Sequence, residues 1–448
     1  MKRFLETLRN IWSIEDLRKK IITTLTLILV YRVGSYIILP GVNSEAINDF
    51  LANSGSAGGI LNLIDMFAGG AFSRASVLAL GIMPYISASI IMQIAGIAIP
   101  MLQKMQREGE SGRRRINQIT RFLTIVICAL QAPGYLSATV TNIPGAVSND
   151  GPLWWFSTIA ILISGTLFVM WIGERITEKG LGNGISLIIM IGIIANLPAA
   201  FLGEVAEKFT GGGGLVVLLV EIAVLLFVIL LCILLVQGTR RIPIHRAKQI
   251  IGRGNRQMQT MAQRDFIPLK VNAVGVMPII FAQAIMFVPS FFFQGTSMGA
   301  TFADIRGFWY NFIFFVMCVG FTYLYTAIVI NPVQIADDLK RNNVFIPGIK
   351  PGKSTSEYID NLLSRITLPG AVFLGLVAIL PAFAMNAGIT SQFSYFFGGT
   401  SLLIMVGVVL DTLQQVETHL LNRHYDGLMK SGRIKGRSGS AVSMPQAY

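Results

Sequence analysis

The hydrophobic residues of this chain gather into long runs that polar residues separate. A helix needs about 20 apolar residues to cross a bilayer core about 30 Å thick. Ten runs of that order lie at 21–39, 75–98, 122–140, 153–172, 184–202, 215–237, 271–293, 308–331, 367–387 and 398–420. The pattern predicts an all-α polytopic membrane protein with ten transmembrane helices.

The basic residues between these runs alternate from one side of the membrane to the other. Of the 36 Lys and Arg residues, all but four lie in the N-terminal tail, in the even-numbered connections or in the C-terminal tail. The opposite side carries only Arg74, Lys208 and Arg306, and Arg32 lies inside the first run. Because positively charged loops stay cytoplasmic, we expect both termini in the cytoplasm.

Ten spans divide into two sets of five, and an odd number of spans per set makes the second set enter from the opposite side. Such inverted halves are common in transport proteins, with the conducting path between them. The expected organisation is a cytoplasmic segment at 1–20, an N-terminal half at 21–202, an external hinge loop at 203–214, a C-terminal half at 215–420 with cytoplasmic loops at 238–270 and 332–366, and a cytoplasmic tail at 421–448. A central pore between the halves follows.

The stretch 60–99 is too long for one spanning helix and is broken at Gly69 and Gly70. Its first part, residues 60–72, is too short to cross, which favours a re-entrant helix. Irregular backbone at that depth is tolerated only inside protein or beside water, so a cavity on the non-cytoplasmic side is implied. The alternative is a short amphipathic helix on the membrane surface.

Ionisable residues inside the apolar runs are few. Arg32, Glu221 near a helix end and Asp411 are the main ones, and the sequence shows no pairing pattern among them. An ion-coupled carrier usually needs such groups facing its interior, so their scarcity weighs against a secondary transporter, the second hypothesis. Neutral polar residues such as Gln93 and Gln283 are expected to bond neighbouring helices.

The sequence offers no constellation for catalysis or metal binding. Cys128, Cys232 and Cys318 lie inside apolar runs, where we expect packing rather than a disulfide framework. The three histidines have no cysteine or carboxylate neighbours at metal-ligand spacing. With no nucleophile beside a base and no nucleotide-binding motif, we expect neither a cofactor nor an enzyme, and an intramembrane enzyme is the least supported hypothesis.

Two cytoplasmic connections are large and basic. Residues 238–270 hold eight Lys and Arg, more than orientation alone requires. Residues 346–352 form a turn in which Pro347 and Pro351 stiffen an exposed tip. Rigid basic tips of this kind suit docking to acidic protein or RNA.

Several segments resemble the SecY/Sec61-alpha family and occur in family order. They are residues 66–76 (MFAGGAFSRAS), 79–91 (ALGIMPYISASII), 108–113 (EGESGR), 182–186 (GNGIS), 268–272 (PLKVN), 347–352 (PGIKPG) and 397–404 (FGGTSLLI). The resemblance covers roughly residues 12–435. It implies a protein-conducting channel of the general secretory pathway in the bacterial plasma membrane, which translocates unfolded preproteins and releases transmembrane segments into the bilayer.

The resemblance also assigns site residues. It implies a pore ring made of Ile82, Ile86, Ile185, Ile189, Ile280 and Ile404. It implies a plug that includes Ile60, Leu63, Met66, Phe67, Gly69, Gly70, Phe72 and Arg74. It places Ser87 and Asn272 at a lateral gate that opens toward lipid. Positions four apart on a helix share a face, so the two isoleucine pairs can point together.

The partners implied by the resemblance supply the energy, since the chain has no nucleotide site. They are the SecA ATPase or an elongating ribosome, the membrane subunits SecE and SecG, the accessory proteins YidC and SecDF, the secretory polypeptides themselves and a bilayer with anionic lipids. The residues expected to dock the motor and the ribosome are Arg240, Arg241, Arg253, Arg256 and Lys350. Relatives usually carry Arg where this chain has Lys350, which keeps the charge and loses the planar guanidinium.

Overall fold

The fold was determined as a computed structural model of the 448-residue chain. The structure describes residues 12, 14–43, 46–47, 65–141, 143, 145–147, 151–210, 214–246, 264–272, 275–292 and 305–430. Within these ranges the chain is mostly helical, with one small sheet.

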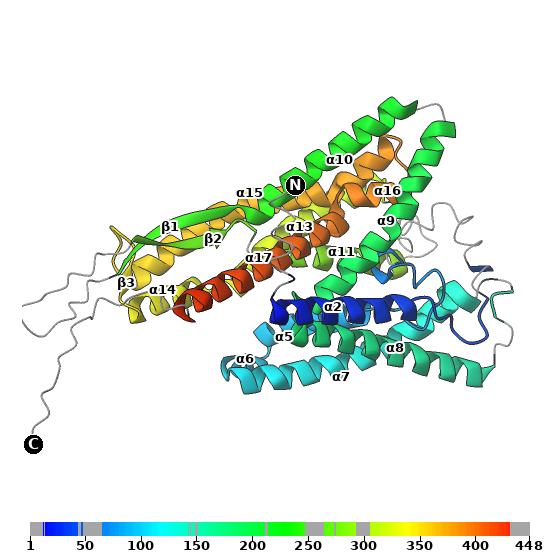
Figure 1. The fold of residues 1–448 in the computed structure, drawn as a ribbon, viewed down its shortest axis with the longest axis horizontal. Coiled ribbons are helices and arrows are strands. Elements are labelled where there is room, and N and C mark those ends of the chain that lie inside the picture. Colours follow the sequence, from blue (N-terminus) through cyan, green and yellow to red (C-terminus); the bar gives the residue numbers. More distant parts are fainter. Residues whose placement is uncertain are drawn as a thin grey trace, which may run out of the picture.

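The N-terminal part forms one group of helices. Its elements are α2 (Glu15–Gly34), α5 (Met83–Ala98), α6 (Pro100–Arg107), α7 (Glu110–Tyr135), the π-helical turn η2 (Leu136–Thr141), α8 (Pro152–Lys179) and α9 (Gly184–Thr210). Helices α2, α7 and α8 lie nearly parallel, and α9 rises steeply from this group toward the rest of the molecule (Figure 1). Helix α9 thereby lies between the two parts of the chain.

The C-terminal part forms the second group. Its elements are α10 (Gly214–Gln237), β1 (Thr239–Arg246), β2 (Arg264–Lys270), α11 (Met277–Phe292), α13 (Phe308–Val329), α14 (Pro332–Arg341), β3 (Val344–Phe345), α15 (Lys353–Asn386), α16 (Ser391–Ser394), the 3-10 turn η3 (Tyr395–Phe397) and α17 (Gly399–Lys430). The strands form an antiparallel sheet in the order β2-β1-β3, with Thr239 opposite Lys270 and His245 opposite Phe345. The sheet and α14 project at one end of this group (Figure 1).

Seven helices in the described part of the chain are long and apolar enough to span a membrane. They begin at Glu110, Pro152, Gly184, Gly214, Phe308, Lys353 and Gly399. The pair α5 and α6, bent by 101°, would make an eighth. Helix α2 carries five charges in its first six residues, and the described part of α11 has 16 residues, so neither meets the same test. The count of ten spans stays a prediction.

Two expected boundaries are wrong in the structure. The run 75–98 is not one helix, because residues 77–82 form turns and α5 begins only at Met83. Gly81 has a φ of +52°, which interrupts a helix, and Pro84 then occupies the first turn of α5, where proline is well tolerated. The hinge loop expected at 203–214 is mostly helix, since α9 continues to Thr210 and α10 starts at Gly214.

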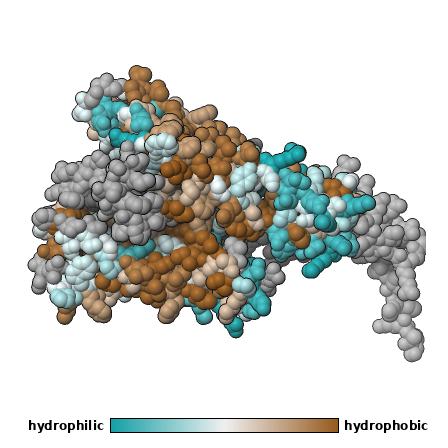
Figure 2. Space-filling view, turned by 180° about the vertical axis from the view of Figure 1, so that it is seen from behind, coloured by the Kyte–Doolittle hydropathy of each residue, from teal (hydrophilic) through white to brown (hydrophobic). Residues whose placement is uncertain are grey.

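The surface fits a lipid environment. Large apolar side chains are exposed along the spanning helices, including Phe122, Phe156 and Phe227. Figure 2 shows broad hydrophobic surface over the helix bodies and hydrophilic surface gathered toward the end that carries the sheet. The three cysteines are buried and free, which confirms their expected packing role.

Candidate functional site

The six isoleucines assigned to the pore ring belong to one apolar cluster or pack against it, and we call it the isoleucine cluster. Ile82, Ile189 and Ile404 are buried members of it, with exposed fractions of 4%, 6% and 5%. The other three are half-buried and pack against it, namely Ile86, Ile185 and Ile280. Four segments far apart in the chain, the start of α5, α9, α11 and α17, therefore contribute isoleucines to the same cluster.

Helical spacing places the two isoleucines of each pair on the same side of their helix. The amide of Ile86 donates to the carbonyl of Ile82 at 3.1 Å, so these residues are one helical turn apart even though α5 starts just after Ile82. Ile185 and Ile189 lie one turn apart on α9. Helix α9 starts close against α8, since a Cβ at Gly184 would lie 2.0 Å from the carbonyl oxygen of Gly173.

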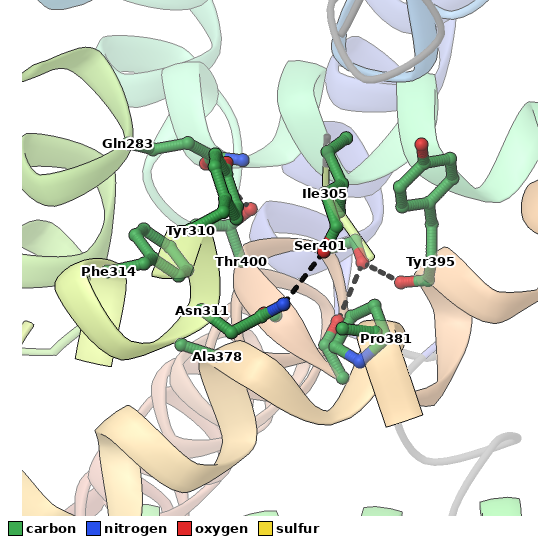
Figure 3. Close-up of a pocket in the computed structure, with 13 residues that line it drawn as sticks. Gln283, Ile305, Tyr310, Asn311, Phe314, Ala378, Pro381, Tyr395, Thr400 and Ser401 are labelled. Atoms are coloured by element: carbon green, nitrogen blue, oxygen red, sulfur yellow. Dashed lines mark hydrogen bonds between the residues drawn. The ribbon is translucent and has the colours of Figure 1, made fainter. Parts of the chain in front are cut away.

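A polar cluster fixes the beginning of α17, which carries Ile404. Thr400 Oγ1 donates to Gln283 Oε1 at 3.1 Å, which confirms that Gln283 bonds a neighbouring helix. Ser401 Oγ donates to the carbonyl oxygens of Tyr395, at 2.5 Å, and of Gly398, at 3.1 Å. These groups line a cavity of about 40 Å³, drawn in Figure 3. The cavity has room for a few water molecules and is too small for a polypeptide path.

The described part of the expected plug lies against the same cluster. Met66 is 4% exposed within it, and Phe67 packs on it. Residues 65–68 are helical, and the chain then turns through Gly69 and Gly70, whose φ values are +67° and +82°. The chain passes very close to α9, because a Cβ on Gly192 would lie 2.8 Å from the carbonyl oxygen of Phe67. Ile60 and Leu63 lie outside the described residues.

The rest of this turn packs into a second apolar cluster under α7 and α8. Phe72 is 6% exposed there, and its ring packs in a tilted arrangement on that of Tyr135, with the ring centroids 4.7 Å apart. The phenol of Tyr135 donates to the carbonyl of Phe72 at 2.9 Å. The amide of Ser73 donates to Asp65 Oδ1 at 2.8 Å, which closes the turn on itself. Residues 65–73 therefore form an ordered turn packed against α7 and α8, and the re-entrant plug itself stays a prediction.

The two residues assigned to the lateral gate do not hydrogen-bond to each other in the described structure. Ser87 Oγ donates to the carbonyl of Met83 within α5 at 3.1 Å, and Asn272 is 9% exposed with no partner for its Oδ1. A side-chain bond between α5 and α13 is instead made by the phenol of Tyr325, which donates to Gln93 Oε1. Gln93 thus bonds a neighbouring helix as expected, and Tyr325 is a residue that the sequence reasoning missed.

A groove opens beside this bond. Its volume is about 430 Å³, and its walls come from α5, α6, α11 and α13. Phe281, Phe321 and Leu324 form apolar parts of the wall, while Gln93, Gln103 and Gln106 supply amides. The boundary of α5 with α11 and α13 at this groove therefore combines apolar side chains with a few amides.

The basic residues assigned to docking occupy two parts of one platform. Arg240 and Arg241 are exposed on β1, and Lys350 is exposed on the turn after β3. The platform is held by a small apolar cluster made of Ile242, Ile244, Leu269, Val344, Ile346, Ile359 and Leu363. Arg253 and Arg256 lie outside the described residues.

The turn that carries Lys350 is stiff. Gly348 and Gly352 have φ values of +82° and +104°, and the carbonyl of Lys350 accepts a 2.9 Å hydrogen bond from Thr355 Oγ1. Helix α14 beside it is capped by Asn331, whose Oδ1 accepts from the amides of Val333 and Gln334 at 3.1 and 3.3 Å. A partner that binds this tip meets a rigid surface continuous with α15.

Comparison with known proteins gives one consistent family. The model of the SecY family matches residues 76–413. Protein translocase subunit SecY of Chlamydia trachomatis serovar D is 39% identical over 459 residues, covering 96% of this chain and 99% of that protein. The Escherichia coli K12 protein of the same name is 38% identical and covers 94% of this chain and 96% of its own length.

Solved structures agree in fold. A protein-conducting channel superposes with a TM-score of 0.60 at 18% identity, covering 92% of this chain and 94% of its own. Sec61 in the canine ribosome–channel complex from the endoplasmic reticulum superposes with a TM-score of 0.56 at 17% identity, with the same coverage. The family match spans the isoleucine cluster, the Tyr325–Gln93 tie and the platform. This chain, a multi-pass membrane protein, belongs to the SecY family.

Proposed function

We propose that the chain is the protein-conducting channel of a bacterial general secretory pathway. Unfolded preproteins pass through it across the plasma membrane, and apolar segments leave it sideways into lipid. The observation that carries this proposal is the convergence of six isoleucines from four segments onto one cluster, with Met66 and Phe67 of the re-entrant turn directly against it.

The chemistry of the cluster fits such a pore. A ring of aliphatic side chains excludes ions by dewetting, and it recognises no particular sequence. Isoleucine side chains can also close around an extended chain of varied composition. A seal of this kind suits a channel that must pass many different polypeptides.

The two halves, residues 21–202 and 215–420, would move apart at the seam where α5 faces α11 and α13. Few polar ties cross that seam, and the Tyr325–Gln93 bond is the clearest of them among the described residues. We place the lateral gate there, with Ser87 and Asn272 on its rim. Asn272 Oδ1, buried and unpartnered, would gain a partner when water or a polypeptide enters the gate.

Energy comes from partners that dock on the cytoplasmic side. The platform of β1, β2, β3 and α14 presents Arg240, Arg241 and Lys350 on a rigid base, which favours acidic surfaces of the SecA motor or the ribosome. SecE and SecG are the proposed membrane subunits, and YidC and SecDF are proposed accessory partners. Orientation by positive loops places both termini in the cytoplasm.

Site-specific photocrosslinking tests the proposal. A photoreactive amino acid is placed at position 189, in the isoleucine cluster, and in a matched variant at position 227, where Phe227 on α10 is 61% exposed. With a secretory polypeptide arrested during transport, we expect crosslinks from position 189 and almost none from position 227. Equal crosslinking at both positions, or none at 189 while export proceeds, would contradict a path through the cluster.

A further inference from the structure

Arg32 is a charged residue in the last turn of α2 whose partner the sequence does not reveal. In the structure its Nη1 donates to the carbonyl oxygen of Gly69 at 2.9 Å. No carboxylate of the described residues forms an ion pair with it. Burying a guanidinium even in part is costly unless it is hydrogen-bonded, and Arg32 is half-buried. Its bond to Gly69 offsets part of that cost.

The preceding residue of α2 makes a parallel contact. Tyr31 is 1% exposed, and its phenol donates to the carbonyl of Ala68 at 3.3 Å. Two consecutive side chains of α2 thus hold two consecutive carbonyls of the turn. Those carbonyls are available because the short helix 65–68 ends there, and Gly69 and Gly70 turn the chain away with positive φ values.

Close approach requires glycine at this contact. A Cβ on Gly69 would lie 2.7 Å from Arg32 Nη1 and 3.0 Å from the Cα of Gly192 on α9. The turn is therefore wedged between the guanidinium on one side and bare backbone of α9 on the other. A displacement of the turn away from α2 breaks the Arg32 bond.

Tyr36 joins Arg32 to the far end of the turn. Its ring lies 5.6 Å from the guanidinium carbon of Arg32 and 4.2 Å from that of Arg74. Both distances are within the range of cation–π attraction. Gly69 and Arg74, five residues apart in the turn, are thereby both connected to the end of α2.

We propose that Arg32 is a positioning residue that latches the re-entrant turn against the isoleucine cluster, so that breaking its bond to Gly69 is a step in opening the pore. This inference rests on the proposed channel function. A hydrogen bond from a charged donor is stronger than a neutral one, yet a carbonyl partner makes it weaker than an ion pair. Such a tie holds the resting state and still yields to an entering polypeptide.

The test is the resting ion conductance of the purified translocase, with its membrane subunits, in planar bilayers without substrate. Arg32→Leu should raise the open fraction about tenfold, which corresponds to about 1.4 kcal/mol. Arg32→Lys keeps a charged donor and should stay near wild type. Arg175→Leu is the matched control, because Arg175 pairs with Glu178 at 3.1 Å on an exposed surface far along the chain from the turn.

Tyr36→Leu is the second variant, to be used if Arg32→Leu fails to assemble. It leaves the Arg32 charge and helix α2 in place. It should raise the conductance by a smaller factor than Arg32→Leu. Wild-type conductance in both variants, with transport of polypeptide intact, would overturn the latch and leave the channel proposal standing. Absence of polypeptide transport by the wild-type translocase would instead overturn the channel proposal.

Discussion

A buried group of charges lies where α9 meets α10, at the junction of the two helix groups. Lys208 Nζ lies 3.3 Å from Glu204 Oε1 and 3.0 Å from Glu221 Oε1, and it donates to the carbonyl of Gly388 at 2.8 Å. Glu204 is fully buried, and its Oε2 accepts from the amide of Thr390 at 2.8 Å. One lysine thus connects α9, α10 and the connection between α15 and α16.

We predict that Lys208→Met strongly destabilises the protein. The substitution leaves the carboxylates of Glu204 and Glu221, which are 0% and 7% exposed, without their counter-ion. Removing one partner of a buried ion pair costs about 3–5 kcal/mol, because the remaining charge is desolvated and unpaired. Replacing the partner as well should recover much of the loss, so the double variant Lys208→Met, Glu221→Gln should be more stable than the single one.

The measurement is the denaturant concentration at the unfolding midpoint of the purified protein, titrated in a mild detergent. Arg114→Met is the matched control, because Arg114 pairs with Glu110 at 2.7 Å while both side chains are about four-fifths exposed. Exposed pairs contribute little, so this variant should unfold like wild type. If Lys208→Met unfolded at the same midpoint as Arg114→Met, the reasoning from buried charge would be refuted.

Two further predictions concern the seam and the platform. Tyr325→Phe removes the hydrogen bond to Gln93, worth on the order of 1 kcal/mol, and should let less hydrophobic signal segments open the gate. The control Tyr323→Phe on the same helix should not have this effect. Identical export of a graded series of signal segments in both variants would contradict the prediction. Lys350→Glu should block motor-driven export in reconstituted vesicles while membrane insertion stays normal. Lys350→Arg should be at least as active as wild type. ATP-dependent export at the wild-type rate by the Glu variant would exclude a docking role for this tip.

The sequence by itself determined the features that depend on local composition. Apolar runs of spanning length predicted the helices at 153–172, 184–202 and 215–237, which the structure contains as α8, α9 and α10. It also predicted that the cysteines pack and that Gln93 and Gln283 bond neighbouring helices. These predictions succeed because burial in lipid requires a long apolar segment, whatever the rest of the chain does.

Only the tertiary structure decided which charged and polar groups meet. Arg32 hydrogen-bonds to the carbonyl of Gly69, and Lys208 forms an ion pair with Glu221. The sequence had shown no pairing pattern among the charges inside the apolar runs. The same holds for the start of α5 at Met83, which depends on the turn before it, and for the short sheet that assembles from segments about 100 residues apart. Hydrophobicity is a property of each segment alone, whereas a hydrogen bond or an ion pair depends on geometry that two distant segments acquire only when the helices pack.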